Sequence, residues 1–243
     1  MPFDFSALPI VDAHAHPFMP SREKKVYGRR YILSSDRYTP VPQTDIENTL
    51  AYRMILIELA RLLHMDPDSP DEEIITARND LARKNYQAYV EMLFQDAGIV
   101  AYLNETGFPI QGARLRPEEK REFKNAIARL NVLEIIRCEM TCNHLIADAG
   151  RMLSFDEFLD MFRKNIRDRV KNGRIAALKT VIGYFSGLEI LWTEKSAAER
   201  SFYAHYYGKQ LERAIQKPFR DFMVFECVRL CEELRLPLQI HTG

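Results

Sequence analysis

Five short apolar segments recur along the 243 residues, and stretches with helical character separate them. The apolar segments cover residues 9–16, 98–103, 132–139, 175–182 and 236–241. Strands that alternate with helices pair in parallel, because a helical crossover brings the chain back to the same end of the sheet. The sequence therefore predicts an α/β fold built on a parallel sheet.

Helix start and stop signals fill the intervening stretches. The predicted helices cover residues 44–63, 70–96, 117–130, 154–171 and 220–234. Thr44 with Glu47, and Ser154 with Glu157, have the spacing of capping boxes. Gly173 is expected to end the fourth of these helices in a left-handed conformation, and Pro218 is expected to divide the helical stretch before residue 220.

The segment from residue 18 to residue 97 is too long for an ordinary loop between a strand and a helix. We expect it to be a helical insertion that follows the first strand, inside a single domain that covers residues 1–243. Because loops at the carboxyl ends of barrel strands shape binding sites, this insertion is the first candidate for substrate selection.

Bulk composition excludes several functional classes. Lys and Arg number 34, as do Asp and Glu, so no basic surplus indicates nucleic-acid binding. No apolar run approaches the roughly 20 residues of a membrane helix, and the N-terminus lacks the features of a signal peptide. The four cysteines lack zinc-knuckle spacing. We predict a cytoplasmic protein whose partner is a small-molecule substrate, with neither nucleic acid nor membrane, and which forms homo-oligomers.

Two histidines end the first apolar segment. His14 and His16 are separated by one residue, and side chains two apart on a strand point to the same face. Pro17 ends the strand, so the pair lies at its carboxyl end. Two imidazoles on one face provide half of a divalent metal site. The alternative is that they are simply two polar residues at a strand end.

Lys179 lies inside the otherwise apolar fourth strand. Burial disfavours the ammonium form, and a neutral amine is a nucleophile. Such an amine forms a Schiff base with a carbonyl compound or a carbamate with carbon dioxide, and a carbamate could bridge two metal ions. The alternative is a lysine that extends from the strand end to water.

Three further residues follow the ends of strands. His241 follows the fifth strand, and we group it with His14, His16 and Lys179 as a candidate ligand set for zinc or a related divalent ion. Arg137, at the end of the third strand, could bind a substrate carboxylate or instead form an ion pair with Glu139. Tyr184 could donate a hydrogen bond to a substrate, or it could be an aromatic residue at the rim.

Three motifs resemble the amidohydrolase superfamily. They are Val-Asp-Ala-His-Ala-His-Pro from residue 11, Ala-Leu-Lys-Thr-Val-Ile-Gly-Tyr-Phe-Ser-Gly-Leu from residue 177, and Leu-Pro-Leu-Gln-Ile-His-Thr-Gly from residue 236. They are similar to the branch described as predicted metal-dependent hydrolases of TIM-barrel fold. The resemblance implies a (β/α)₈ barrel. It also implies that His14, His16, Lys179 and His241 bind one or two divalent ions, zinc first among them. Lys179 is then open to carboxylation, and Lys179 and His241 take part in catalysis.

The family pattern also includes a histidine on the sixth strand and an aspartate on the eighth. Three further strand–helix units need about 90 residues, so we expect an incomplete barrel of about five of the eight strands. The resemblance implies a metal-dependent hydrolase in which activated water attacks a C–N bond, such as an amide, of a small molecule. The alternatives are a decarboxylase, a sugar-acid isomerase, a Schiff-base lyase that uses Lys179, or an inactive fragment.

Overall fold

The structure is a computed structural model, and it describes residues 8–17, 42–105, 121 and 124–242. The backbone groups into two compact units. Unit 1 comprises residues 1–9, 18–99 and 115–130, and unit 2 comprises residues 10–17, 100–114 and 131–243. The arrangement of residues 18–97 as an insertion within one domain stays a prediction. Of the predicted helix over 117–130, the structure describes residues 121 and 124–130.

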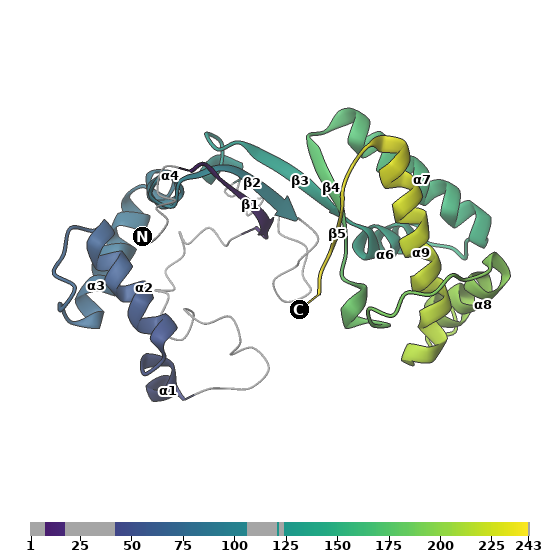
Figure 1. Cartoon of the computed structure of the whole chain (residues 1–243), viewed down its shortest axis with the longest axis horizontal. Coiled ribbons are helices and arrows are strands. Elements are labelled where there is room, and N and C mark those ends of the chain that lie inside the picture. Colours follow the sequence, from purple (N-terminus) through teal and green to yellow (C-terminus); the bar gives the residue numbers. More distant parts are fainter. Residues whose placement is uncertain (1–7, 18–41, 106–120, 122–123, 243) are drawn as a thin grey trace, which may run out of the picture. The chain divides into compact units, whose positions relative to one another are not determined.

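Four helices form the described part of unit 1. They are α1 (Gln43–Glu47), α2 (Leu50–Leu62), α3 (Asp71–Lys84) and α4 (Tyr86–Asp96) (Figure 1). Helices α1, α2 and α3 share a small core that is apolar except for one tyrosine hydroxyl, which donates to Asp71 at 2.9 Å. The core residues are Ile46, Tyr52, Leu56, Ala60, Ile74 and Ile75.

Two of the predicted helix boundaries in unit 1 are wrong, and polar side chains explain both. Thr44 does not cap a helix, because α1 begins before it; Thr49 is the N-cap of α2 and accepts a hydrogen bond from the amide of Tyr52. Asn85 adopts an extended conformation that ends α3. Its side chain accepts from the amide of Ala88 and so begins α4. Asparagine competes with helical hydrogen bonds in this way, which divides the predicted helix over 70–96.

A five-stranded sheet carries unit 2. Its strands are β1 (Ile10–Ala15), β2 (Ile99–Glu105), β3 (Val132–Arg137), β4 (Ile175–Thr180) and β5 (Leu238–Ile240), in the spatial order β1-β2-β3-β4-β5. The pairs β2–β3, β3–β4 and β4–β5 are parallel. The predicted α/β class and the order of the strands along the chain are confirmed. All the carboxyl ends of β2 to β5 therefore meet at one edge of the sheet.

Helices α6 (Cys138–Ala149) and α9 (Arg213–Leu234) pack against β3, β4 and β5 (Figure 1). Helix α7 (Phe155–Asn172) packs on α6 and α9, and α8 (Lys195–Tyr206) packs on α9. A short 3₁₀ turn spans Ile182–Tyr184. Stacked and tilted phenylalanine rings form the centre of the core, with centroids 4.9 to 6.3 Å apart. Ring pairs at these distances add stabilisation beyond the area that they bury. The rings belong to Phe155, Phe158, Phe162, Phe202 and Phe219.

Two details of unit 2 differ from the sequence prediction, and a third agrees with it. The third strand ends at Arg137, because α6 begins directly at Cys138. Gly173 ends α7 in an extended conformation, whereas the left-handed cap belongs to Gly150 at the end of α6. The capping box of Ser154 and Glu157 is confirmed, with both reciprocal hydrogen bonds present.

Pro218 lies inside α9 rather than dividing the helical stretch. The Ser201 hydroxyl of α8 enters the helix there: it donates to the carbonyl of Ile215 and accepts from the amide of Phe219 at 3.1 Å. A side chain inserted into the backbone ladder is a recognised way to accommodate a bend in a helix. The helix therefore continues because α8 pairs the backbone groups that are separated at the proline.

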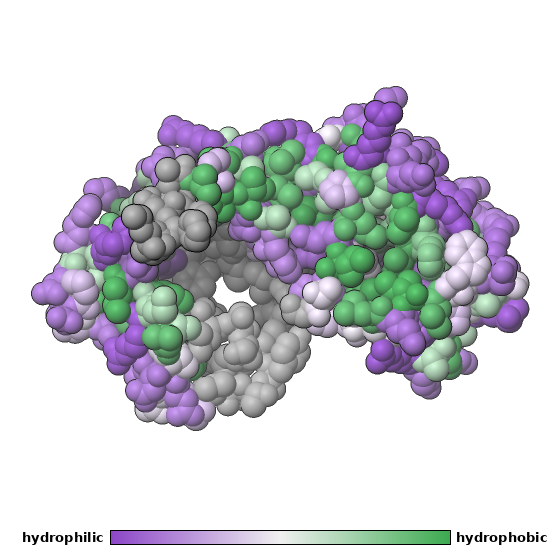
Figure 2. Space-filling model, in the orientation of Figure 1, coloured by the Kyte–Doolittle hydropathy of each residue, from purple (hydrophilic) through white to green (hydrophobic). Residues whose placement is uncertain are grey.

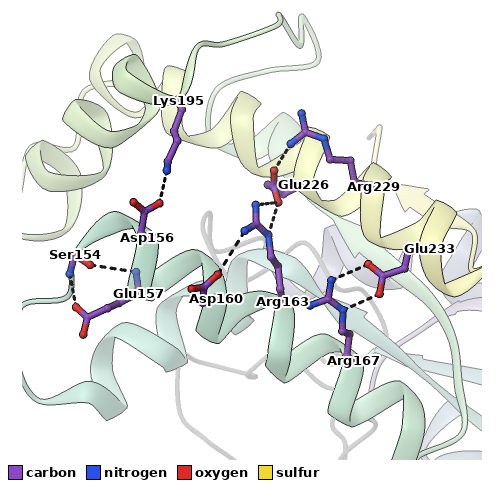
Figure 3. A network of polar contacts seen from close by, with 10 residues as sticks. All are labelled: Ser154, Asp156, Glu157, Asp160, Arg163, Arg167, Lys195, Glu226, Arg229 and Glu233. Carbon is purple, nitrogen blue, oxygen red and sulfur yellow. Dashed lines mark hydrogen bonds and ion pairs between the residues drawn. The ribbon is translucent and has the colours of Figure 1, made fainter.

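A row of ion pairs joins the outer surfaces of α7 and α9. Arg163 donates two hydrogen bonds to Glu226, and Arg167 binds Glu233 through two parallel contacts of 2.7 and 2.8 Å (Figure 3). Two-point contacts between arginine and carboxylate fix the relative position of the groups that they join. The row therefore holds α7 and α9 in register above the sheet. In the described part of the chain, no helix is long and apolar enough to cross a membrane.

Candidate metal centre

Three imidazole rings gather at the carboxyl ends of β1 and β5. The His14 ring lies 5.7 Å from the His16 ring and 5.2 Å from the His241 ring, measured between centroids. Gln239 of β5 also donates a hydrogen bond of 2.7 Å to the main-chain carbonyl of Ala13 in β1. The first and last strands of the sheet therefore meet near these rings, although 226 residues separate Gln239 from Ala13.

Lys179 lies next to these rings and is fully enclosed. Its side chain is 1% exposed, and its amine has no hydrogen-bond partner among the described residues. Desolvation lowers the pKa of Lys179, and the positive charge of Arg137 lowers it further, whereas the carboxylates of Glu105 and Glu139 oppose the change. The structure thus excludes the alternative in which this lysine extends to water.

The charge of Lys179 reaches two of the histidines. Desolvation lowers the pKa of His14 and of His241, and for each ring the next cause is repulsion from Lys179. Neutral imidazole is the form that binds metal ions, so this environment favours the ligand form of both rings. Lys179 therefore lies close enough to both rings for its charge to affect them.

Glu105, at the end of β2, is a site residue that the sequence did not identify. It is fully buried, and its Oε2 lies 3.2 Å from Nδ1 of His16 and 3.9 Å from Nη1 of Arg137. Its main-chain oxygen lies 3.4 Å from the same Nδ1. Because a carbonyl oxygen can only accept, this contact is a hydrogen bond when Nδ1 carries the proton, and Nε2 is then unprotonated.

Glu139 does not form the ion pair with Arg137 that the sequence offered as an alternative. As the second residue of α6, it is buried, and its Oε1 accepts hydrogen bonds from the Thr180 hydroxyl at 2.5 Å and from the amide of Val181 at 2.9 Å. These contacts fix the chain directly after Lys179. The ion pair of Arg137 is with Glu105 instead.

Tyr184 contacts the third imidazole. Its hydroxyl lies 2.5 Å from Nε2 of His241, and its ring is 68% exposed. The tyrosine therefore joins His241 to the surface of the molecule. Its predicted role in substrate binding, like that of Arg137, stays a prediction.

Imidazole is a common ligand of divalent ions, and the His14 ring lies within 6 Å of the rings of both His16 and His241. Across the described residues, however, no three His, Cys, Asp or Glu side chains form a group that could hold a metal ion as they stand. The four cysteines are buried and reduced, which agrees with a packing role.

Solved structures share this architecture. A "putative metal-dependent hydrolase" from Lactobacillus casei superposes with a TM-score of 0.75 at 19% identity, over 98% of this chain and 59% of that one. The fold is an incomplete TIM barrel. Uronate isomerase from Thermotoga maritima superposes on this barrel with a TM-score of 0.60 at 16% identity, over 98% of this chain and 60% of the isomerase.

One curated protein is similar to the chain in sequence. Protein fluG from Emericella nidulans is 20% identical over 259 aligned residues, which cover 97% of this chain and 29% of that protein. No family model matches the chain. The chain therefore spans less than a third of the curated relative and about three fifths of each solved neighbour.

Proposed function

We propose that this incomplete barrel is part of a metal-dependent hydrolase of the amidohydrolase type. The observation that supports the proposal is the convergence of His14, His16 and His241 beside the buried amine of Lys179. Chemistry in TIM barrels takes place at the carboxyl ends of the strands, where these residues lie. The metal-dependent hydrolase among the structural neighbours supports the same class of reaction.

In this proposal the three imidazoles and Lys179 would hold one or two divalent ions, with zinc the first candidate. Such an ion acts as a Lewis acid and makes water a nucleophile at neutral pH. Glu105 keeps Nε2 of His16 available by holding the proton on Nδ1. Arg137 binds a carboxylate of the substrate, and Tyr184 donates a hydrogen bond to it. The substrate is a small molecule with an amide or related C–N bond.

The Lys179 amine takes one of two forms in this site. Its lowered pKa raises the fraction of neutral amine. That amine can add to carbon dioxide, forming an N–C bond and releasing one proton to water, and the resulting carbamate is an anionic ligand. Without this addition, the neutral amine itself is the donor.

A direct test measures divalent-ion binding by the purified chain. Calorimetric titration with zinc chloride should show binding, which His14→Ala, His16→Ala and His241→Ala should each weaken by at least about tenfold. His64→Asn is the matched control, because His64 has a φ of 57° that asparagine tolerates and it lies outside this group. Equal binding by all four variants and the native chain would refute the site.

A sugar-acid isomerase is the second candidate. The uronate isomerase among the neighbours favours it, as does the guanidinium of Arg137, since a sugar acid carries a carboxylate that arginine binds at two points. Turnover of uronates rather than amides by the zinc-loaded chain would select the isomerase. A Schiff-base lyase would instead bind no metal, and borohydride with a carbonyl substrate would trap it at Lys179.

A further inference from the structure

Helix α2 carries two apolar faces, of which only one is buried. Tyr52, Leu56 and Ala60 recur every four residues and pack into the core of unit 1, with exposures of 0 to 3%. A second row consists of Leu50, Met54 and Ile57, whose exposures are 74%, 56% and 48%. Apolar surface also interrupts the hydrophilic surface in the region of α1 and α2 in Figure 2.

The spacing of the exposed row follows one face of a helix. Successive members are four and three residues apart. The next position of this spacing is Arg61, which ends the apolar row. This is the alternating spacing of the a and d positions of a two-stranded coiled coil. Single exposed apolar side chains are ordinary, but a continuous stripe on a helix indicates a contact surface.

The charges beside the stripe are complementary to those of an identical helix. With Leu50 and Ile57 at d and Met54 at a, Arg53 takes a g position and Glu58 the following e position. In a parallel pair, a g residue faces the e residue five positions later on the other helix. Arg53 would therefore face Glu58 of the partner subunit, twice by symmetry.

These two side chains are available for such contacts. The Arg53 side chain is 55% exposed and the Glu58 side chain 59%. Their present ion pairs, to Asp71 and Arg61, are at the surface, where such pairs contribute little to stability. Arg53 and Glu58 can therefore leave these partners and pair with each other across two copies of the chain at little cost in free energy.

We propose that α2 is a self-association surface at which two copies of this chain pair in parallel through Leu50, Met54 and Ile57. The inference does not depend on the metal site, which lies in unit 2. Three apolar positions and two ion pairs are a small contact. The expected association is therefore weak, and it rises with protein concentration.

Cysteine cross-linking tests the geometry of the pair. In a parallel pair each a or d residue faces its own copy, so Leu50→Cys and Met54→Cys should both form disulfide-linked dimers. In an antiparallel pair centred on the helix, the two copies of residue 50 would lie about 18 Å apart along the axis, and only Met54→Cys would cross-link. Ile55→Cys is the control, since Ile55 is 38% exposed on another face of the helix.

We expect the four native cysteines to form no cross-links, because all four are buried and burial raises the pKa of Cys142. Cross-linking of residues 50 and 54 but not of residue 55 supports the proposal. Cross-linking of residue 54 alone, of all three, or of none would overturn it.

A charge exchange tests the partner assignment in solution. Arg53→Glu and Glu58→Arg should each place like charges opposite each other and weaken dimerisation by about tenfold in sedimentation equilibrium. The double variant restores opposite charges and should recover the native affinity. A native chain that stays monomeric at all concentrations, or a double variant as weak as the single ones, would contradict the parallel pair.

Discussion

At the scale of single residues, the most informative side chain is Lys179. Its amine is buried without a hydrogen-bond partner in the described residues, and its lowered pKa shows that desolvation outweighs the attraction of the nearby carboxylates. Such a residue weakens the fold, because an unpaired buried polar group costs about 1–3 kcal/mol. Residues that reduce stability in this way are typical of functional sites.

Lys179→Met should therefore stabilise the protein while it removes a ligand. Methionine fills a similar volume without a charge, so we expect a rise of a few degrees in the thermal midpoint. Zinc binding should fall at the same time. Differential scanning calorimetry and zinc titration measure the two effects. Lys164→Met, at an exposed position, is the control and should change neither.

A lower thermal midpoint for Lys179→Met would contradict this reading. It would mean that the amine is stabilised by Glu105 and Glu139 more than it is destabilised by burial.

The sequence predicted roles for the histidines, for the lysine and for Glu139, but it predicted none for Glu105. His14, His16 and His241 end or follow an apolar run and Lys179 interrupts one, and both patterns are visible in the sequence. Glu105 also ends a strand, but a glutamate before a polar loop is common. Its importance comes from the pairing of β2 beside β3, which brings it to Arg137 and His16. That pairing is a tertiary property that no local pattern encodes.

At the scale of elements, the order of strands and helices followed from periodicity, whereas several boundaries did not. The helix predicted over 70–96 divides at Asn85, and the helix predicted from residue 220 begins at Arg213. In both places a side-chain hydrogen bond decides the outcome. For α9 that bond comes from Ser201 on a neighbouring helix, so it is absent from the local sequence.

Ser201→Ala should destabilise α9 at its bend. The carbonyl of Ile215 and the amide of Phe219 would both lose their partner in the core, at a cost of about 1–3 kcal/mol. Chemical denaturation followed by circular dichroism measures the loss. Ser196 lies at an exposed position of α8, the helix that also carries Ser201, and Ser196→Ala should change the unfolding free energy little. Equal effects of the two substitutions would refute the proposed role of Ser201.

The start of α7 should show a pH dependence. Hydrogen bonds from Arg151 and from the Ser154 box lower the pKa of Glu157 to about 2, from an ordinary value of 4.5. Because the folded-state pKa is the lower one, the stabilisation is complete above about pH 4.5 and is lost as the pH falls toward 2. The native chain should therefore lose its advantage over Glu157→Gln across that interval.

Thermal midpoints of both proteins from pH 7 to pH 2 measure this difference. A difference that is constant over the whole range would show that the charge of Glu157 does not contribute.

At the scale of the whole molecule, the two end strands of the described sheet are apolar and exposed. Ile10 and Val11 of β1 are 48% and 53% exposed, and Ile240 of β5 is 43% exposed. Exposed edges of this kind promote association between chains, and lysine is a residue with which natural proteins prevent it.

Val11→Lys should therefore reduce light scattering by concentrated protein without removing the α2-dependent dimer. Leu211→Lys is the control: Leu211 is 71% exposed and lies outside every strand. Identical scattering by both variants and the native chain would exclude the β1 edge as an association surface.

The bond from Gln239 to Ala13 also has a consequence for how the protein forms. It joins residues 226 positions apart, and closing so long a loop is slow because its entropy is lost before any contact compensates. During synthesis β1 leaves the ribosome long before β5 exists. His14 and His16 are therefore synthesised well before His241. The assembled site should be among the last features to form during folding.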